Sequence, residues 1–284
     1  MGAACGCFPK KSMKSDRQPL LGHNEETGLD SARRLVDWLS TEPSGIEPRI
    51  TEERIQDLCN LAYSDQIDRK EAAAVSFVEL CQRMTQPVPE MMLPPIIKLL
   101  QSPEYEVQKP ASLALTNLAT RGPAQNKIMI VQSGALSALI SLLESPHDDI
   151  RCNASGCITT LATLDTTKRQ IAVHGAIPPL IALIKNTDIT KHAILRNATG
   201  ALLNLSHIEI NRYDLHRAGV SKEFMRLLSS EDEDVQFYSC AALSNLAVHS
   251  AIRLALTQEQ DGLIFNALIR LLSSRSEKVI CTNS

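Results

Sequence analysis

Residues 198–206 read ATGALLNLS, and other stretches of the chain repeat this pattern of small, apolar and polar positions. They read ASLALTNLAT at 111–120, ASGCITTLAT at 154–163 and CAALSNLAV at 240–248. Aligning Asn117, Thr160, Asn204 and Asn245 places successive copies 43, 44 and 41 residues apart. The apolar residues of each copy recur at helical spacing, so each stretch predicts a helix. The chain is therefore expected to use one structural unit several times.

The order of segments inside each unit is also repeated. An apolar helix such as ALSALISLLES (135–145) leads through an acidic turn into the Ala-rich helix quoted above. Before it comes a short helix that ends in glycine, as in KRQIAVHG (168–175). Glycine there can take the left-handed conformation that closes a helix. Small residues in the Ala-rich helix, such as Gly200, would let neighbouring helices approach closely. This period and three helices per unit predict an all-α, right-handed armadillo-repeat superhelical solenoid.

The segments QSGALSALISLLESPHDDIRCNASGCITTLAT (132–163) and LRNATGALLNLSH (195–207) resemble armadillo repeats, in particular those of the vacuolar protein 8 family. The resemblance divides the chain into an N-terminal acylation and basic segment (1–28), an N-terminal helix with a degenerate first repeat (29–85), armadillo repeats (86–258) and an incomplete terminal repeat (259–284). In the degenerate repeat Glu79 replaces the asparagine. Members of that family have many more repeats, so the chain is expected to be a fragment or a short isoform.

The composition favours packed helices and excludes some partners. Hydrophobic residues make up 44% of the chain and aromatic residues only 4%, so the core must consist mainly of Leu, Ile, Ala and Val. The net charge of -3 lacks the basic excess of nucleic-acid-binding proteins, and we expect no nucleic-acid partner. Cysteines inside the helical patterns are expected to be reduced, buried thiols. No apolar run approaches the roughly 18 residues of a membrane span, so membrane association would require an anchor.

No arrangement of residues in the sequence predicts catalysis. The seven histidines are isolated, no cysteine pair has zinc-site spacing beyond Cys5 and Cys7, and there is no phosphate-binding loop or nucleophile elbow. We therefore expect no enzyme activity, no small-molecule substrate, no metal and no cofactor.

The third helix of each repeat carries the candidate binding residues. The resemblance implies that Asn117, Asn204 and Asn245 line a concave groove, where each amide could hold the backbone of an extended partner peptide. The alternative is a structural role in which these amides bond to neighbouring backbone. Nuclear-import adaptors of this fold carry tryptophan four residues before each asparagine, whereas this chain has Leu113, Gly200 and Ala241 there.

Two arginines stand near the start of third helices, at matching places. Arg151 and Arg196 could meet acidic residues of a partner in the groove. The alternative is a solvated ion pair within the chain, which is the commoner state of a surface arginine.

The first residues, MGAACGCFPKK, suggest attachment to a membrane by lipid. Gly2 is the expected myristoylation site, although position 6 holds Gly6 rather than the usual Ser or Thr. One myristoyl chain binds membranes only marginally, so a second signal is needed. Palmitoylation of Cys5 and Cys7 would supply it, aided by a basic cluster that faces anionic lipid: Lys10, Lys11, Lys14 and Arg17. Asp16, Leu20 and Leu21 also form a weak acidic dileucine sorting motif.

The sequence thus predicts a protein-binding scaffold tethered by its acyl chains to the cytosolic face of a vacuole or lysosome, with a possible cytoplasmic pool. The family resemblance implies roles in vacuole inheritance, vacuole fusion, organelle contact or autophagy. The alternative is a soluble armadillo adaptor of the nuclear-import or signalling type. The intact mass of the protein made in eukaryotic cells would distinguish the two.

Overall fold

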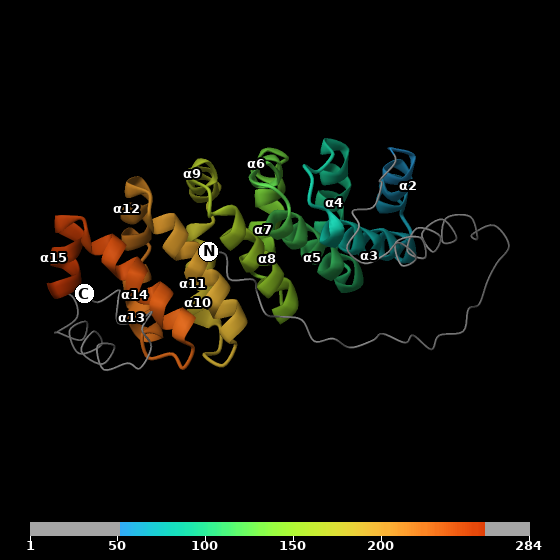
Figure 1. Cartoon of the computed structure of the whole chain (residues 1–284). Coiled ribbons are helices and arrows are strands. Elements are labelled where there is room, and N and C mark those ends of the chain that lie inside the picture. Colours follow the sequence, from blue (N-terminus) through green and yellow to red (C-terminus); the bar gives the residue numbers. More distant parts are fainter. Residues whose placement is uncertain (1–51, 259–284) are drawn as a thin grey trace. The chain divides into compact units, whose positions relative to one another are not determined.

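A computed structural model describes residues 52–258 of the 284-residue chain (Figure 1). Within this range every regular element is helical. The elements are α2 (Glu52–Ala62), α3 (Ile67–Arg83), η1 (Glu90–Met92), α4 (Leu93–Leu100), α5 (Tyr105–Arg121), α6 (Ala124–Gln132), α7 (Ala135–Leu142), α8 (Asp148–Leu161), α9 (Asp165–Val173), α10 (Ile177–Asn186), α11 (His192–Ser206), α12 (Glu209–Arg217), α13 (Val220–Leu227), α14 (Glu233–Ala247) and α15 (Ser250–Gln258). The all-α prediction is confirmed.

The chain divides into two compact units, residues 1–138 and 139–284. In the described part of unit 1, α3 and α5 pack against each other, and α4 packs on α5. In unit 2, α11 packs against both α8 and α14, so the third helices of successive repeats are neighbours. Figure 1 shows the shorter first helices α9 and α12 above them, which places first and third helices in separate layers of the unit. The predicted order of three helices per repeat is observed in α9–α11 and in α12–α14.

Glycines close the first helices, as predicted. Gly134, Gly175 and Gly219 have φ of 84°, 83° and 77°, in the left-handed region. After α9, the Gly175 N–H donates to the Ala172 carbonyl (2.9 Å) and the Ala176 N–H donates to the Ile171 carbonyl (3.3 Å). These paired bonds satisfy the last carbonyls of the helix, and a residue with a Cβ atom would strain the backbone at the glycine.

The cores of both units consist mainly of Ala, Leu, Ile and Val side chains. The prediction of buried, reduced cysteines is confirmed for the described thiols, which are buried and form no disulfide: Cys59, Cys81, Cys152, Cys157 and Cys240. Burial raises the pKa of Cys81 to about 12, so this thiol stays protonated and unreactive at neutral pH. Among residues 52–258, no helix is long and apolar enough to cross a membrane.

Candidate functional site: the asparagine ladder of the third helices

The predicted asparagines all lie in the last turns of third helices. Asn117 is on α5 in unit 1, whereas Asn204 on α11 and Asn245 on α14 belong to unit 2. We call these three residues the ladder asparagines, and the side of α8, α11 and α14 that carries Asn204 and Asn245 the ladder face of unit 2. Their surroundings differ, which bears on whether each amide is structural or available to a partner.

The amides of unit 2 bond to the preceding third helix. Asn204 Nδ2 donates to the Thr159 carbonyl of α8 (3.2 Å), and Asn245 Nδ2 donates to Ser206 Oγ at the end of α11 (2.9 Å). The Thr159 carbonyl lies in the last turn of α8, where carbonyls lack a partner within the helix. Asn204 therefore satisfies a helix end in the neighbouring repeat. Both asparagines stay half-exposed, and an amide has further bonding capacity beyond one N–H.

The Asn117 amide of unit 1 is more buried, and its nitrogen makes no such hydrogen bond within the described residues. Asn117 is only 6% exposed, and its Nδ2 has no hydrogen-bond partner among residues 52–258. A buried donor without a partner costs about 1–3 kcal/mol, so such groups in folded proteins call for an explanation. Of the ladder asparagines, Asn117 is the one whose donor the described residues leave unused.

Two other third helices have a different side chain at the position of the ladder asparagines. At the equivalent place on α8, the Thr160 hydroxyl donates to the Gly156 carbonyl within its own helix (2.9 Å). On α3 the place belongs to Glu79, which is half-buried. Neither side chain offers an amide, so the ladder is interrupted at these positions, as the sequence indicates.

Small residues beside the ladder allow contact between third helices, as predicted. A Cβ atom on Gly156 would lie 3.0 Å from Asn197 Nδ2, and one on Gly200 would lie 3.4 Å from the ring of Tyr238. Asn197 itself is buried and donates to the Cys152 carbonyl (3.0 Å). Side chains from neighbouring third helices thus lie against the bare backbone of these glycines, and at Gly200 the nearest atom is Thr159 Cγ2 of the preceding α8 (3.2 Å).

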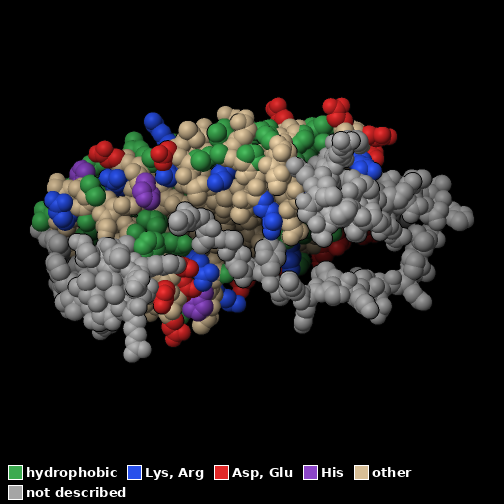
Figure 2. Space-filling view, viewed as in Figure 1, with side chains coloured by type: hydrophobic (Ala, Val, Ile, Leu, Met, Phe, Trp, Pro, Cys, Tyr) green, Lys and Arg blue, Asp and Glu red, His purple; other side chains and the backbone are tan. Residues whose placement is uncertain are grey.

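The two predicted arginines form ion pairs within unit 2. Arg151 pairs with Asp148, whose other oxygen is 2.8 Å from Lys191 Nζ. These two cations hold the pKa of Asp148 below its ordinary value through hydrogen bonds from Lys191 and then Arg151. Figure 2 shows such acidic and basic side chains mixed at the lower edge of unit 2, where α11 and α14 begin in Figure 1.

Arg196 joins α11 to the start of α14. Its guanidinium pairs with Asp232, and its Nε lies 3.4 Å from Asp234. Asp232 also caps α14 by accepting from the Val235 N–H (3.0 Å). Burial alone would raise the pKa of Asp232, but the hydrogen bonds from Arg196 and Val235 outweigh it and hold the pKa below its ordinary value. Arg151 and Arg196 therefore already have carboxylate partners, and their role toward an acidic partner protein remains a prediction.

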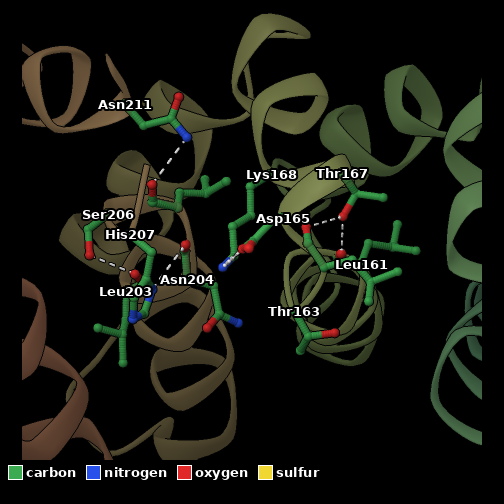
Figure 3. A network of polar contacts seen from close by, with 12 residues as sticks. Leu161, Thr163, Asp165, Thr167, Lys168, Leu203, Asn204, Ser206, His207 and Asn211 are labelled. Carbon is green, nitrogen blue, oxygen red and sulfur yellow. Dashed lines mark hydrogen bonds and ion pairs between the residues drawn. The ribbon is translucent and has the colours of Figure 1, made fainter. Parts of the chain in front are cut away.

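The junction between third and first helices contains a second set of repeated contacts, which was not predicted from the sequence (Figure 3). In α9 the Thr167 hydroxyl bonds to the Leu161 carbonyl, and in α12 Asn211 Nδ2 bonds to the Leu205 carbonyl (3.1 Å). Both contacts satisfy carbonyls at the end of the preceding third helix, and both polar side chains are buried.

A cation follows each of these polar residues. Lys168 pairs with Asp165 (2.7 Å) although only 9% of its side chain is exposed, and Arg212 donates to the Ser206 carbonyl (2.8 Å). Arg253 in α15 donates in the same way to the Ala247 carbonyl (2.9 Å). Positive charge is favourable at a helix C-terminus. The signal was present as the dipeptides Thr-Lys (167–168) and Asn-Arg (211–212), one repeat apart. The similar Asn-Lys at 126–127 does not make the contact, because Asn126 Oδ1 accepts from the Val88 N–H (2.8 Å) and its Nδ2 has no hydrogen-bond partner among residues 52–258.

The family model described as Armadillo/beta-catenin-like repeat matches residues 81–120, 123–163, 167–207 and 214–248. The chain belongs to this armadillo-repeat family. The four matches contain all three ladder asparagines and both arginines.

Relatives of this armadillo protein include vacuolar protein 8 from several fungi. The chain is 41% identical over 134 residues to vacuolar protein 8 of Komagataella pastoris, covering 47% of this chain and 23% of that one. It is 37% identical over 141 residues to that of Saccharomyces cerevisiae, covering 48% of this chain and 22% of the relative. The chain thus spans less than a quarter of the length of these relatives.

Solved structures confirm the armadillo fold. A computationally designed armadillo repeat protein for modular peptide recognition superimposes with a TM-score of 0.71 at 23% identity, covering 81% of this chain and 96% of the design. A designed armadillo repeat protein in complex with peptide (KR)4 gives a TM-score of 0.69 at 22% identity, covering 82% and 97%.

Several predicted residues of this armadillo protein lie outside the described range. They are the acylation, basic and sorting residues Gly2, Cys5, Cys7, Lys10, Lys11, Lys14, Asp16, Arg17, Leu20 and Leu21. The terminal segments 1–28 and 259–284 lie outside it as well. Between residues 52 and 258, no group of three or more His, Cys, Asp or Glu side chains could hold a metal ion.

Proposed function

We propose that this armadillo protein is a scaffold that captures extended segments of other proteins on the faces carrying the ladder asparagines. The observation that carries the proposal is the state of Asn117, which is nearly buried and has a donor with no partner among the described residues. A peptide carbonyl from a partner would satisfy that donor. Rotation about the Cβ–Cγ bond of Asn117 exchanges the nitrogen and oxygen of its amide, so either atom can face the partner.

Asn204 and Asn245 would have two roles, unlike Asn117. Each already gives one N–H to the neighbouring repeat, but each is half-exposed and keeps bonding capacity for a partner's backbone. We propose that these two residues both join repeats and contact the partner. Peptide binding is compatible with the fold, because a designed armadillo repeat protein of this fold was solved with a bound peptide.

We further propose that the scaffold works at the cytosolic face of a vacuole or lysosome. The similarity to vacuolar protein 8 supports this location, as does the N-terminal pattern of Gly2, Cys5 and Cys7. A myristoyl chain on Gly2 alone would bind only marginally, so palmitoylation of the cysteines would provide lasting attachment. Vacuole inheritance, vacuole fusion, organelle contact and autophagy are the processes in which such a scaffold would serve.

Site-specific crosslinking in cells tests the binding face. A photoreactive residue at Ala241, which lies on the ladder face of unit 2, should capture partner proteins. The same residue at Val173, which is 75% exposed on α9, is the matched control and should not capture them. If both positions capture the same proteins, or if Asn204→Ala with Asn245→Ala leaves capture at Ala241 unchanged, the ladder face is not the binding site.

Lipid attachment is tested on the full chain made in eukaryotic cells. The intact mass should show acyl chains, and Gly2→Ala should move the protein from the membrane fraction to the cytosol. Cys5→Ser with Cys7→Ser should leave weak membrane contact through one chain. A Gly2→Ala protein that remains fully on membranes would contradict the myristoylation proposal. An unmodified mass would favour the soluble adaptor.

A further inference from the structure

Exposed apolar side chains gather on the first helices of unit 2 and beside them. Among residues 52–258, five large apolar side chains have more than half of their surface exposed, and four of the five belong to unit 2. Val173 lies on α9, Ile210 (55%) on α12 and Leu254 on α15, and Val248 (66%) lies in the turn between α14 and α15. A single exposed apolar residue is ordinary, but several in one region indicate a contact surface.

Two of these side chains border a contact between α12 and the turn after α14. The Tyr213 hydroxyl bonds to His249 Nε2, and the two rings meet edge to face with centroids 4.6 Å apart. Ile210 precedes Tyr213 by one helical turn, and Val248 is the chain neighbour of His249. Tyr213 is itself 44% exposed. Apolar side chains of the two elements are therefore brought close together.

Two arginines flank these side chains. Arg253 donates to the Ala247 carbonyl (2.9 Å), beside Val248, and Arg212 adjoins Tyr213 and donates to two carbonyls at the end of α11 (2.8 and 3.1 Å). Neither guanidinium forms an ion pair with a carboxylate among residues 52–258. Each has five N–H donors, so donors remain for a further acceptor. We define the outer patch as Ile210, Arg212, Tyr213, Val248 and Arg253.

The charge of this region favours an anionic surface. Helices α12 and α15 together carry three arginines and two carboxylates, and one of those carboxylates, Asp214, is already paired with Arg217 (3.0 Å). The start of α14 is the opposite, because it has a run of four acidic residues at 231–234. Figure 2 shows hydrophobic, basic and histidine side chains together over the place of α12 and α15 in Figure 1. Apolar side chains bordered by cations suit the boundary between lipid headgroups and acyl chains.

We propose that the outer patch docks on a membrane that contains anionic lipid. Ile210 and Val248 insert among the acyl chains, and the Tyr213 ring lies at the level of the headgroups. Arg212 and Arg253 face the lipid phosphates. The apolar side chains come from separate elements, and lipid closes around separate side chains, whereas the core of a protein interface requires closely matched shapes.

The outer patch adds a direct contact to the proposed acyl anchor, and it rests on the proposed function only for its location at a membrane. About 50 residues separate Gly2 from Glu52. Such a length of chain can extend up to about 170 Å, so the acyl chains alone do not fix how the repeats face the membrane. Docking through α12 would fix it. A weak contact suffices, because the anchor raises the local concentration of the patch at the lipid surface.

Vesicle binding by the full chain without acyl groups tests the outer patch. The protein is made in bacteria, and the probe is a phosphatidylcholine vesicle with about one-third phosphatidylserine. Ile210→Ser with Val248→Ser should weaken binding about tenfold and leave the melting temperature unchanged, because both side chains are exposed. Ile189→Ser, at a 40% exposed isoleucine before α11, is the matched control and should have no effect. All three proteins share the basic N-terminal segment, so its contribution cancels, and unchanged binding of the double variant would overturn the inference.

Two further measurements separate insertion from general attraction of charge. An environment-sensitive fluorescent residue at Ile210 should shift its emission to the blue when vesicles are added, whereas the same residue at Ile189 should not. Arg212→Gln and Arg253→Gln should each weaken binding to the anionic vesicles about fivefold and leave binding to pure phosphatidylcholine unchanged. A residue at Ile210 that stays in water while the protein is bound would contradict docking through the outer patch.

The outcomes distinguish this inference from the proposed function. If the intact mass shows no acyl chains but the bacterial protein binds vesicles through Ile210 and Val248, the outer patch is supported and the myristoylation proposal fails. If acyl chains are present but the double serine variant binds vesicles as the wild type does, the anchor stands and the outer patch is wrong. If that variant loses a partner protein while its vesicle binding is unchanged, the patch contacts protein and membrane docking is overturned.

Discussion

Asn117 and Asn204 occupy the same place in their repeats, yet the structure gives them different surroundings. In unit 2 Asn204 bonds to the end of α8, and its neighbour Asn245 bonds to the end of α11. In unit 1 the Nδ2 of Asn117 is buried and unpartnered among residues 52–258. One residue type at one repeat position thus joins repeats in one unit and keeps an unpartnered donor in the other. If both positions contact a partner, removal of the Asn204 amide should lower stability as well as affinity, whereas removal of the Asn117 amide should lower affinity alone.

The largest effect is expected from a charge in the core of unit 2. Leu246 on α14 is fully buried beside Asn245, so Leu246→Asp would bury an unpaired charge at a cost of several kcal/mol. Unit 2 should lose its helical circular dichroism, because each helix buries its apolar face only against neighbouring repeats. Ser244→Asp, at an exposed position on the same helix, is the control. Leu203 is a weaker choice, since it is only half-buried.

The second effect concerns the joining amides. Asn204→Ala leaves the Thr159 carbonyl of α8 without its donor, and Asn245→Ala removes the bond to Ser206. Each change should lower the free energy of unfolding by about 1–3 kcal/mol, which chemical denaturation would detect. Asn186→Ala, at the exposed end of α10, should cost much less. Unchanged stability of the double variant would mean that these bonds do not hold the repeats together.

A smaller effect is expected from acid. The pKa of Asp232 is lower in the folded chain than its unfolded value of about 3.9, so its ion pair stabilises the protein above that pH. This contribution is lost as the pH falls below about 4 and through the folded-state pKa. Asp232→Asn keeps a cap for α14 but removes the charge, and it should cost about 1 kcal/mol at pH 7. Denaturation at neutral and acid pH should show the difference between wild type and variant shrinking, and a constant difference would contradict the ion-pair account.

The fold was predictable because its signals are local and repeated. The helical spacing of Leu and Ala, the closing glycines and the period set the helices, and the structure agrees with them. The hydrogen bonds of each ladder asparagine were not predictable, because they depend on which carbonyl of the neighbouring helix lies within reach. For Asn204 that acceptor is the Thr159 carbonyl. The position of the Tyr238 ring over Gly200 is another contact between repeats that the sequence of one repeat does not reveal.

The contacts of Thr167 and Asn211 with the preceding third helix were predictable only in part. Their dipeptides recur one repeat apart, so the sequence contained the signal. Their role in bonding to the preceding third helix became clear only from the contacts of Thr167 and Asn211.

The most direct test compares Asn117→Ala with Asn204→Ala in the full chain, measuring the melting temperature of both variants and, for Asn117→Ala, the affinity for a partner captured by a photoreactive residue at Leu113, one turn before Asn117 on α5. Asn117→Ala should melt no earlier than the wild type, because it removes a buried donor without a partner. It should weaken binding by 1–3 kcal/mol, or about 5- to 150-fold, because the partner's carbonyl loses its donor. Asn204→Ala should melt earlier. If Asn117→Ala melts as early as Asn204→Ala and binds the partner normally, the amide of unit 1 is structural and the proposed capture of partners by Asn117 is wrong.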